Sequence, residues 1–70
     1  MTNTFTVWKI NIDETFSHKE HLNNWDEVNQ WINENNFANF AIQGDRTGRI
    51  KTFTWSRDKV VLVSEVREIA

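Results

Sequence analysis

One stretch of the chain, residues 24–35, repeats its apolar side chains at helical spacing, and this feature restricts the fold more than any other. The apolar positions recur at i, i+3, i+6 and i+7, which aligns them as one stripe along a 3.6-residue helix: Trp25, Val28, Trp31 and Ile32. The rest of the chain has the patterns of strands and turns. We therefore expect a single helix to cover a single sheet.

Both ends of this helix carry the expected terminal residues. Asn24 is a favoured N-cap because its side-chain oxygen can accept a hydrogen bond from an unpaired amide of the first turn. Glu27 stands in the capping-box position, and its charge lies at the positive end of the helix dipole. Asn35 and Asn36 tolerate the left-handed conformation that ends many helices. The sequence predicts a helix over about 25–35.

Four further segments are rich in β-branched and aromatic residues that alternate or form short apolar runs, which is typical of strands. They are residues 4–12, 37–43, 49–56 and 60–66. The turn between the second and third of them contains both glycines of the chain, and the next turn is short and polar. These last three strands are expected to form a meander.

Residues 15–22 allow two interpretations. They could form a short strand hairpinned on the first one, or an irregular segment that leads into the helix with Phe16 and Leu22 beneath it. We favour a weak edge strand because Lys19 and Glu20 suit an edge that faces water. The predicted fold class is α+β: a single domain over residues 1–70, with a mainly antiparallel sheet of four to five strands and one helix on one face, in the order β-(β)-α-β-β-β.

The composition limits how such a domain can be stabilised. Seventy residues lie near the lower limit for folding without covalent or metal cross-links, and the absence of Cys excludes disulfides and thiolate metal sites. Four Trp and five Phe predict an aromatic core. No stretch approaches the ~20 apolar residues of a membrane span, and the polar first residues are unlike a signal peptide. We expect a cytoplasmic protein without a membrane partner.

The apolar residues outnumber what one covered sheet face needs. The strand at 4–12 has apolar groups on both faces, and residues 60–63 form a continuous apolar run. A β-bulge that shifts the register is one explanation. The other is an apolar patch on the face away from the helix, which would indicate a dimer or partner interface. Its members would be drawn from Phe5, Val7, Phe53, Trp55, Val61 and Val63.

The sequence gives little support to catalysis or metal binding. His18 and His21 would lie together on a helix but on opposite faces of a strand, so we expect them to be exposed polar residues. The serines lack a nucleophile-elbow context, and the adjacent acidic pairs are explained by a turn and a helix start. We expect no enzyme activity, no metal and no cofactor.

One group of residues has chemical character. Residues 45–59 carry a net charge of +3 while the rest of the chain carries −5, and strand alternation aligns basic and aromatic side chains into one stripe. The stripe is the predicted partner-binding site: Arg46, Arg49, Lys51, Phe53, Trp55, Arg57 and Lys59. Such a stripe suits an acidic protein surface or the phosphates and bases of nucleic acid. An aromatic pair in the core with a solvated basic rim would explain the same pattern.

The size of the chain and its β-α-β-β-β element order resemble several small phage-encoded inhibitors of host enzymes, including anti-CRISPR proteins. The resemblance is one of architecture and carries no diagnostic residue. It implies a non-enzymatic protein-binding module that occludes a surface of a larger protein or complex. A small nucleic-acid-binding or regulatory protein that uses residues 46–59 is the alternative, and a homodimer is a third expectation.

Overall fold

The computed structural model describes residues 4–67, with side chains described as far as residue 65. The elements follow the predicted order: β1 (Phe5–Ile10), β2 (Phe16–Leu22), α1 (Trp25–Asn35), β3 (Asn39–Gly44), β4 (Arg49–Ser56) and β5 (Lys59–Arg67). The fold is α+β, as predicted, and residues 15–22 do form an edge strand.

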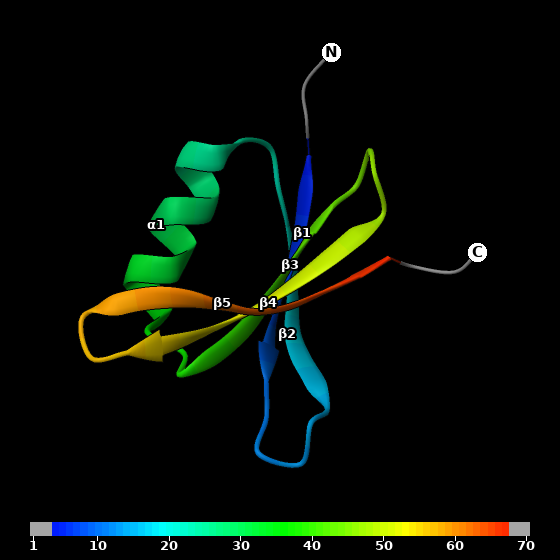
Figure 1. Ribbon diagram of the computed structural model, residues 1–70. Helices are drawn as coiled ribbons and strands as arrows, with labels where there is room; N and C mark the ends of the chain where they lie inside the picture. The colour runs from blue at the N-terminus through cyan, green and yellow to red at the C-terminus, as the bar shows by residue number, and fades with distance from the viewer. Residues whose placement is uncertain (1–3, 68–70) are drawn as a thin grey trace.

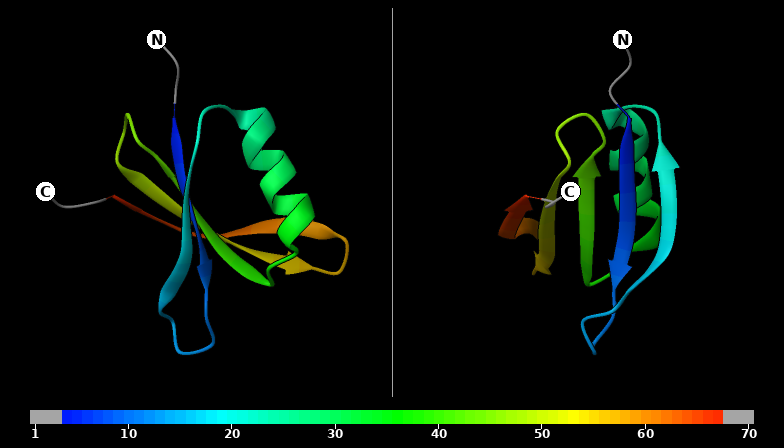
Figure 2. Two further views of the ribbon diagram at one scale, coloured as in Figure 1. Left: turned by 180° about the vertical axis from the view of Figure 1, so that it is seen from behind. Right: turned by 90° about the vertical axis from the view of Figure 1, so that its right-hand side faces the viewer.

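The strands form one antiparallel sheet in the order β2-β1-β3-β4-β5, so the last three strands are the predicted meander. The sheet is strongly twisted, and α1 lies against one side of it (Figure 1). In the right-hand view of Figure 2, where the strands appear side by side, α1 lies behind β1 and its neighbours β2 and β3, whereas β4 and β5 extend beyond it. The helix therefore leaves the β4 and β5 part of its own side of the sheet uncovered.

The ends of α1 are those that the sequence predicts. The Asn24 side chain accepts a hydrogen bond from the Glu27 amide at 2.9 Å, and Asn36 takes the left-handed conformation with φ of 51°. The Glu27 carboxylate accepts a hydrogen bond from the backbone amide of Asn23 at 3.3 Å, one residue earlier than a regular capping box would place it. The polar termini fix the length of the helix.

The core lies between α1 and strands β1, β2 and β3. Its buried side chains come from all four elements: Phe5, Val7, Leu22, Val28, Trp31, Phe40 and Ile42. Trp31 packs edge-on against Phe37 and Phe40, with ring centroids 5.6 and 5.8 Å apart. Edge-to-face packing of this kind adds to the stabilisation from buried area. This Trp is the central contact between the helix and the sheet.

The register places the basic–aromatic strand on the same side of the sheet as the helix. Lys51 pairs with Ile42 and Phe53 with Phe40, and residues opposite each other in an antiparallel pair share a face. Phe5 and Val7 are buried in the core, and Phe53 and Trp55 pack against it. The expected patch on the uncovered face is therefore wrong for these four residues, because the helix lies on their side.

A register shift between β4 and β5 explains the apolar run at 60–63. Thr52 pairs with Ser64 and Phe53 with Leu62, which leaves Val63 as the extra residue of a bulge. Val60 and Leu62 therefore lie on the helix side, opposite Trp55 and Phe53, while Val61 lies opposite Thr54 on the other side. Of the two explanations that the sequence allowed, the bulge is present.

No helix in the described part of the chain is long and apolar enough to cross a membrane.

Replacing Trp31 by Ala should lower the free energy of unfolding by about 3–5 kcal/mol, the range for removing a large aromatic side chain from a packed core. The stability of a domain of this size is of similar magnitude, so Trp31→Phe provides a milder, measurable variant. Asn33→Ala, on the exposed side of α1, should change stability by less than about 0.5 kcal/mol. Urea denaturation followed by circular dichroism tests all three, and equal effects at positions 31 and 33 would contradict the assigned packing.

Candidate basic–aromatic groove

A groove of about 470 Å³ lies on the helix side of the sheet, between the first turn of α1 and the start of β4. Its volume falls in the range of small-ligand and side-chain pockets, about 300–1,000 Å³. Apolar, basic and hydroxyl side chains from five segments line it: Thr4, Phe5, Trp25, Ile42, Gly44, Arg46, Thr47, Arg49, Lys51 and Phe53. Two-sided lining of this kind can take an apolar group and an anion together.

The apolar part of the groove continues the core. Phe5 and Ile42 are buried, and Phe53 stacks on the buried Phe40 with ring centroids 5.4 Å apart and planes 18° apart. Trp25 tilts against Phe5 at 4.7 Å between ring centroids but keeps 55% of its surface exposed. The first residue of the helix stripe therefore presents an indole ring to solvent at the edge of the groove.

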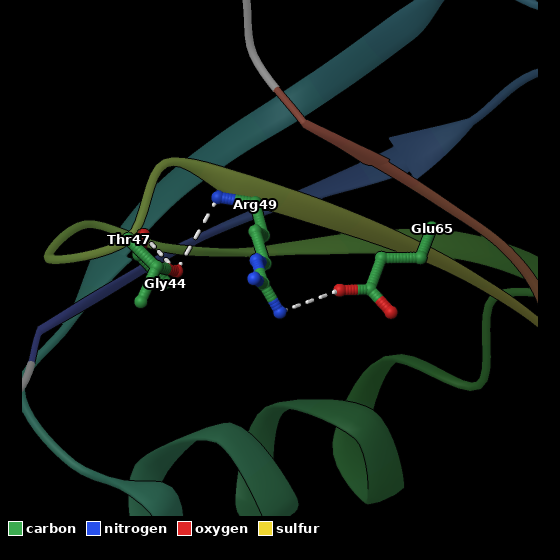
Figure 3. A network of polar contacts seen from close by, with 4 residues as sticks. All are labelled: Gly44, Thr47, Arg49 and Glu65. Atoms are coloured by element: carbon green, nitrogen blue, oxygen red, sulfur yellow. Dashed lines mark hydrogen bonds and ion pairs between the residues drawn. The ribbon is translucent and has the colours of Figure 1, made fainter.

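Three cations lie around these rings, and one described carboxylate reaches them. Arg49 Nη1 lies 3.4 Å from Glu65 Oε1, in an ion pair that leaves both side chains partly exposed (Figure 3). Both side chains project from their strands towards the side on which α1 lies (Figure 3). Glu65 is also the residue opposite Lys51 in the sheet. An exposed pair of this kind contributes ~0–1 kcal/mol. Because Glu65 pairs with only one of the three cations, the lining keeps an excess of positive charge that an anion can use.

The turn between β3 and β4 holds Arg46 at the rim. Asp45 accepts hydrogen bonds from the hydroxyls of Thr4 at 2.7 Å and Thr6 at 2.8 Å, and these bonds lower the pKa of its carboxyl below the ordinary value. Gly48 closes the turn with φ of 72°, and its amide donates to the Gly44 carbonyl at 2.8 Å. The Asp45 carboxylate thus ties this turn to β1.

The structure divides the seven predicted site residues into three groups. Four of them line the groove: Arg46, Arg49, Lys51 and Phe53. Trp55 follows on the same face of β4 but packs against the core. Arg57 and Lys59 lie at the hairpin turn beyond the other end of β4, outside the groove lining. The predicted stripe is therefore divided: four residues line the groove, Trp55 packs against the core, and two cations lie apart from the groove.

Trp55 has a polar atom that finds no partner. Its indole Nε1 is buried without a hydrogen-bond acceptor among the described residues. Leaving a buried donor unpaired costs about 1–3 kcal/mol, which the packing of the ring has to offset. Phe53 and Trp55 therefore belong to the edge of the core, and Phe53 also faces the groove.

Beyond the groove, β5 forms an edge of the sheet with β4 as its neighbour. Four successive apolar residues on it are exposed, from 38% for Val60 to 62% for Val63. Edge strands are commonly protected from pairing by charges or bulges. β5 has a bulge, but no charged residue falls within 60–63.

The described residues contain no group of three or more His, Cys, Asp and Glu side chains that could hold a metal ion. His18 and His21 lie on β2, with the His18 ring 5.5 Å from Phe37 and His21 Nδ1 3.0 Å from Thr6 Oγ1. Comparisons with protein-family models, curated proteins and solved structures found no match to this chain. Function must therefore be argued from the surface itself.

The stripe predicted from the sequence does not include the residues of α1 and β1 that line the other side of the groove. The sequence pattern places Trp25 in the helix stripe and makes Phe5 a candidate for a patch on the other face. Trp25 is the first residue of the helix, and side chains at a helix end often extend past the sheet that the helix covers. This terminal position is the feature of the sequence that could have indicated an exposed ring. Glu65, the counter-ion of Arg49, is distant in sequence, and only strand pairing brings it close.

Trp55→Phe should change the free energy of unfolding by less than about 1 kcal/mol, because it keeps a ring against the core and removes the unpaired N–H. Trp55→Ala should cost about 1.5–3 kcal/mol, below the full range for buried Trp because the side chain is only half-buried. Urea denaturation of both variants gives the comparison. An unaffected Trp55→Ala variant would place this ring outside the core.

Proposed function

We propose that the protein is a non-enzymatic protein-binding module that acts by covering a surface of a larger protein or complex. Its docking surface is the helix side of β4 and β5, which we call the open half of the sheet. The exposed side chains of Val60 and Leu62 on the helix side of β5 are the observation that carries this proposal. Occlusion of the partner's surface, as in small inhibitor proteins, is the mode of action that fits a domain of this size.

The apolar part of the open half is continuous across two strands. Val60 pairs with Trp55 and Leu62 with Phe53, so two exposed aliphatic side chains flank two half-buried aromatic ones. Single exposed apolar residues are ordinary, but a contiguous group at a sheet edge is typical of an interface. A partner strand added to β5 would also satisfy the backbone groups of its outer edge.

The charges around this apolar centre fit the anatomy of a protein interface. Arg46, Arg49 and Lys51 border the centre at one end, and Arg57 and Lys59 follow its other end at the hairpin turn. Interfaces commonly have an apolar centre with a polar rim, and Trp and Arg are enriched among their strongest contacts. A partner with an acidic margin around an apolar patch is the expected match.

Leu62→Lys tests the proposal directly. The variant should lose the protein captured by the wild-type domain from an extract of the source cells, and nuclease treatment should not release that protein from the wild type. A lysine in the apolar centre would be buried without a counter-ion, at a large cost to binding. Its melting temperature should stay close to that of the wild type because Leu62 is half-exposed.

Ile12→Lys is the matched control, since Ile12 is fully exposed in the turn after β1 and far along the sheet from β5. Capture that survives both substitutions would refute the docking surface. If the wild type sediments as a dimer and Leu62→Lys as a monomer, the open half is instead the interface of a homodimer.

Nucleic-acid binding is the second candidate, favoured by the three cations beside the exposed ring of Trp25. The −5 charge of the chain outside residues 45–59 opposes it. We expect dissociation constants no tighter than roughly 10 μM for DNA or RNA near physiological salt, in the ordinary non-specific range. Fluorescence anisotropy across a salt series measures this. Submicromolar affinity that falls steeply with salt would make nucleic acid the partner.

A further inference from the structure

We infer that the basic–aromatic groove binds a short acidic peptide segment of the partner, with one large apolar side chain of that segment inserted between Trp25 and Phe53. This inference rests on the proposed function and names the chemistry that the partner must present. It concerns the groove, whereas the proposal above depends on β5.

The groove is built for an apolar group at its base. Phe5 and Ile42 are buried beneath it and Phe53 is held by stacking on Phe40, so the base is rigid. Trp25 remains more than half exposed although it contacts Phe5, and an inserted side chain would cover its free surface. Burying one leucine-sized side chain contributes about 1.5–3 kcal/mol, which is enough to anchor a flexible segment.

The charges of the groove select an anion. Arg46, Arg49 and Lys51 line it, and Glu65 is the one described carboxylate paired with any of them. The pair with Glu65 shows that Arg49 can donate to a carboxylate in this position, at 3.4 Å between Nη1 and Oε1. A partner carboxylate can therefore exchange with Glu65 or bind the other two cations. Charge-assisted hydrogen bonds from arginine to carboxylate are among the stronger polar contacts.

The acidic surroundings limit how far that anion can extend. Asp26 follows Trp25 on α1, and Glu65 lies on β5 near the opposite wall. A nucleic-acid strand carries a charge on each nucleotide and would run from the cations onto these carboxylates. A peptide can place its acidic residues at the cations and neutral residues elsewhere. The charge pattern therefore favours a peptide over a polynucleotide.

Nuclear magnetic resonance titration of the ¹⁵N-labelled protein tests the inference. The probe is an acetylated and amidated heptapeptide with leucine at its centre, Asp or Glu on either side of the leucine, and neutral residues at the other positions. The Trp25 indole N–H signal and the amides of residues 44–53 should shift and saturate. The same peptide with glycine at its centre should bind about tenfold more weakly, the loss expected for an anchor that is no longer buried.

Two double variants with equal charge change separate the groove from general electrostatics. Arg49→Gln with Lys51→Gln should weaken the leucine peptide about tenfold or more, since charge-assisted hydrogen bonds are lost. Lys9→Gln with Lys19→Gln, on β1 and β2 outside the groove lining, should change affinity less than about twofold, the scale for screened surface charges. Both pairs replace exposed or half-exposed side chains, and their amide spectra confirm the fold.

The contrary results are distinct. Equal weakening by both double variants, or no shift of the Trp25 indole signal, would overturn the inference. Tighter binding of a seven-nucleotide oligothymidine at the same residues would overturn it in favour of nucleic acid. If the captured partner is lost with Leu62→Lys but kept with Arg49→Gln and Lys51→Gln, the proposed function stands and the groove inference fails. If the peptide binds the groove but capture of the partner is unaffected by Leu62→Lys, the groove inference stands and the proposed function fails.

Discussion

An α-helix with its side chains is about 10–12 Å across, whereas the outer strands of a five-stranded sheet lie roughly 19 Å apart, and this mismatch governs the molecule. With one helix of eleven residues, only part of one sheet face can be covered. Trp31 fixes which part, because its edge-on contact with Phe40 places α1 over β1, β2 and β3. The surfaces of β4 and β5 are open because no other element is available to cover them among the described residues.

Burial decreases step by step from the core to the open half of the sheet. Phe40 is buried, Phe53 stacks on it and is half-buried, and Leu62 opposite Phe53 is half-exposed. Each step outward exchanges core packing for accessible apolar surface. The same side chains therefore serve stability at one end of the row and remain available for contact at the other. The unpaired indole N–H of Trp55 lies at this boundary, on a ring that packs against the core.

The groove and the edge strand have different physical characters. The groove combines a rigid aromatic base with cations on the β3–β4 turn and β4, and the turn is held by Asp45 through two threonine hydroxyls. The edge strand presents aliphatic side chains and outward-facing backbone. In protein interfaces generally, charge contributes mainly to the choice and approach of a partner, whereas apolar burial supplies most of the affinity. A small domain that has both on one side is suited to one extended contact with a larger protein.

The sequence by itself determined the elements of this protein. The period and caps of residues 24–36 act within one or two turns of chain, and strand alternation is equally local, so the helix, the element order and the shared face of Arg49, Lys51, Phe53 and Trp55 could all be predicted. Tertiary structure decided which face of each strand meets the helix, because that depends on pairing between distant residues. Register placed Phe5 and Val7 in the core and divided Val60 and Leu62 from Val61 across the sheet, while the bulge left Val63 without an opposite residue. Only the folded chain brings Trp25, Phe5 and Glu65 to Arg49 and Lys51. The sequence could therefore predict the row of basic and aromatic residues along β4, but not the groove that they form with other elements.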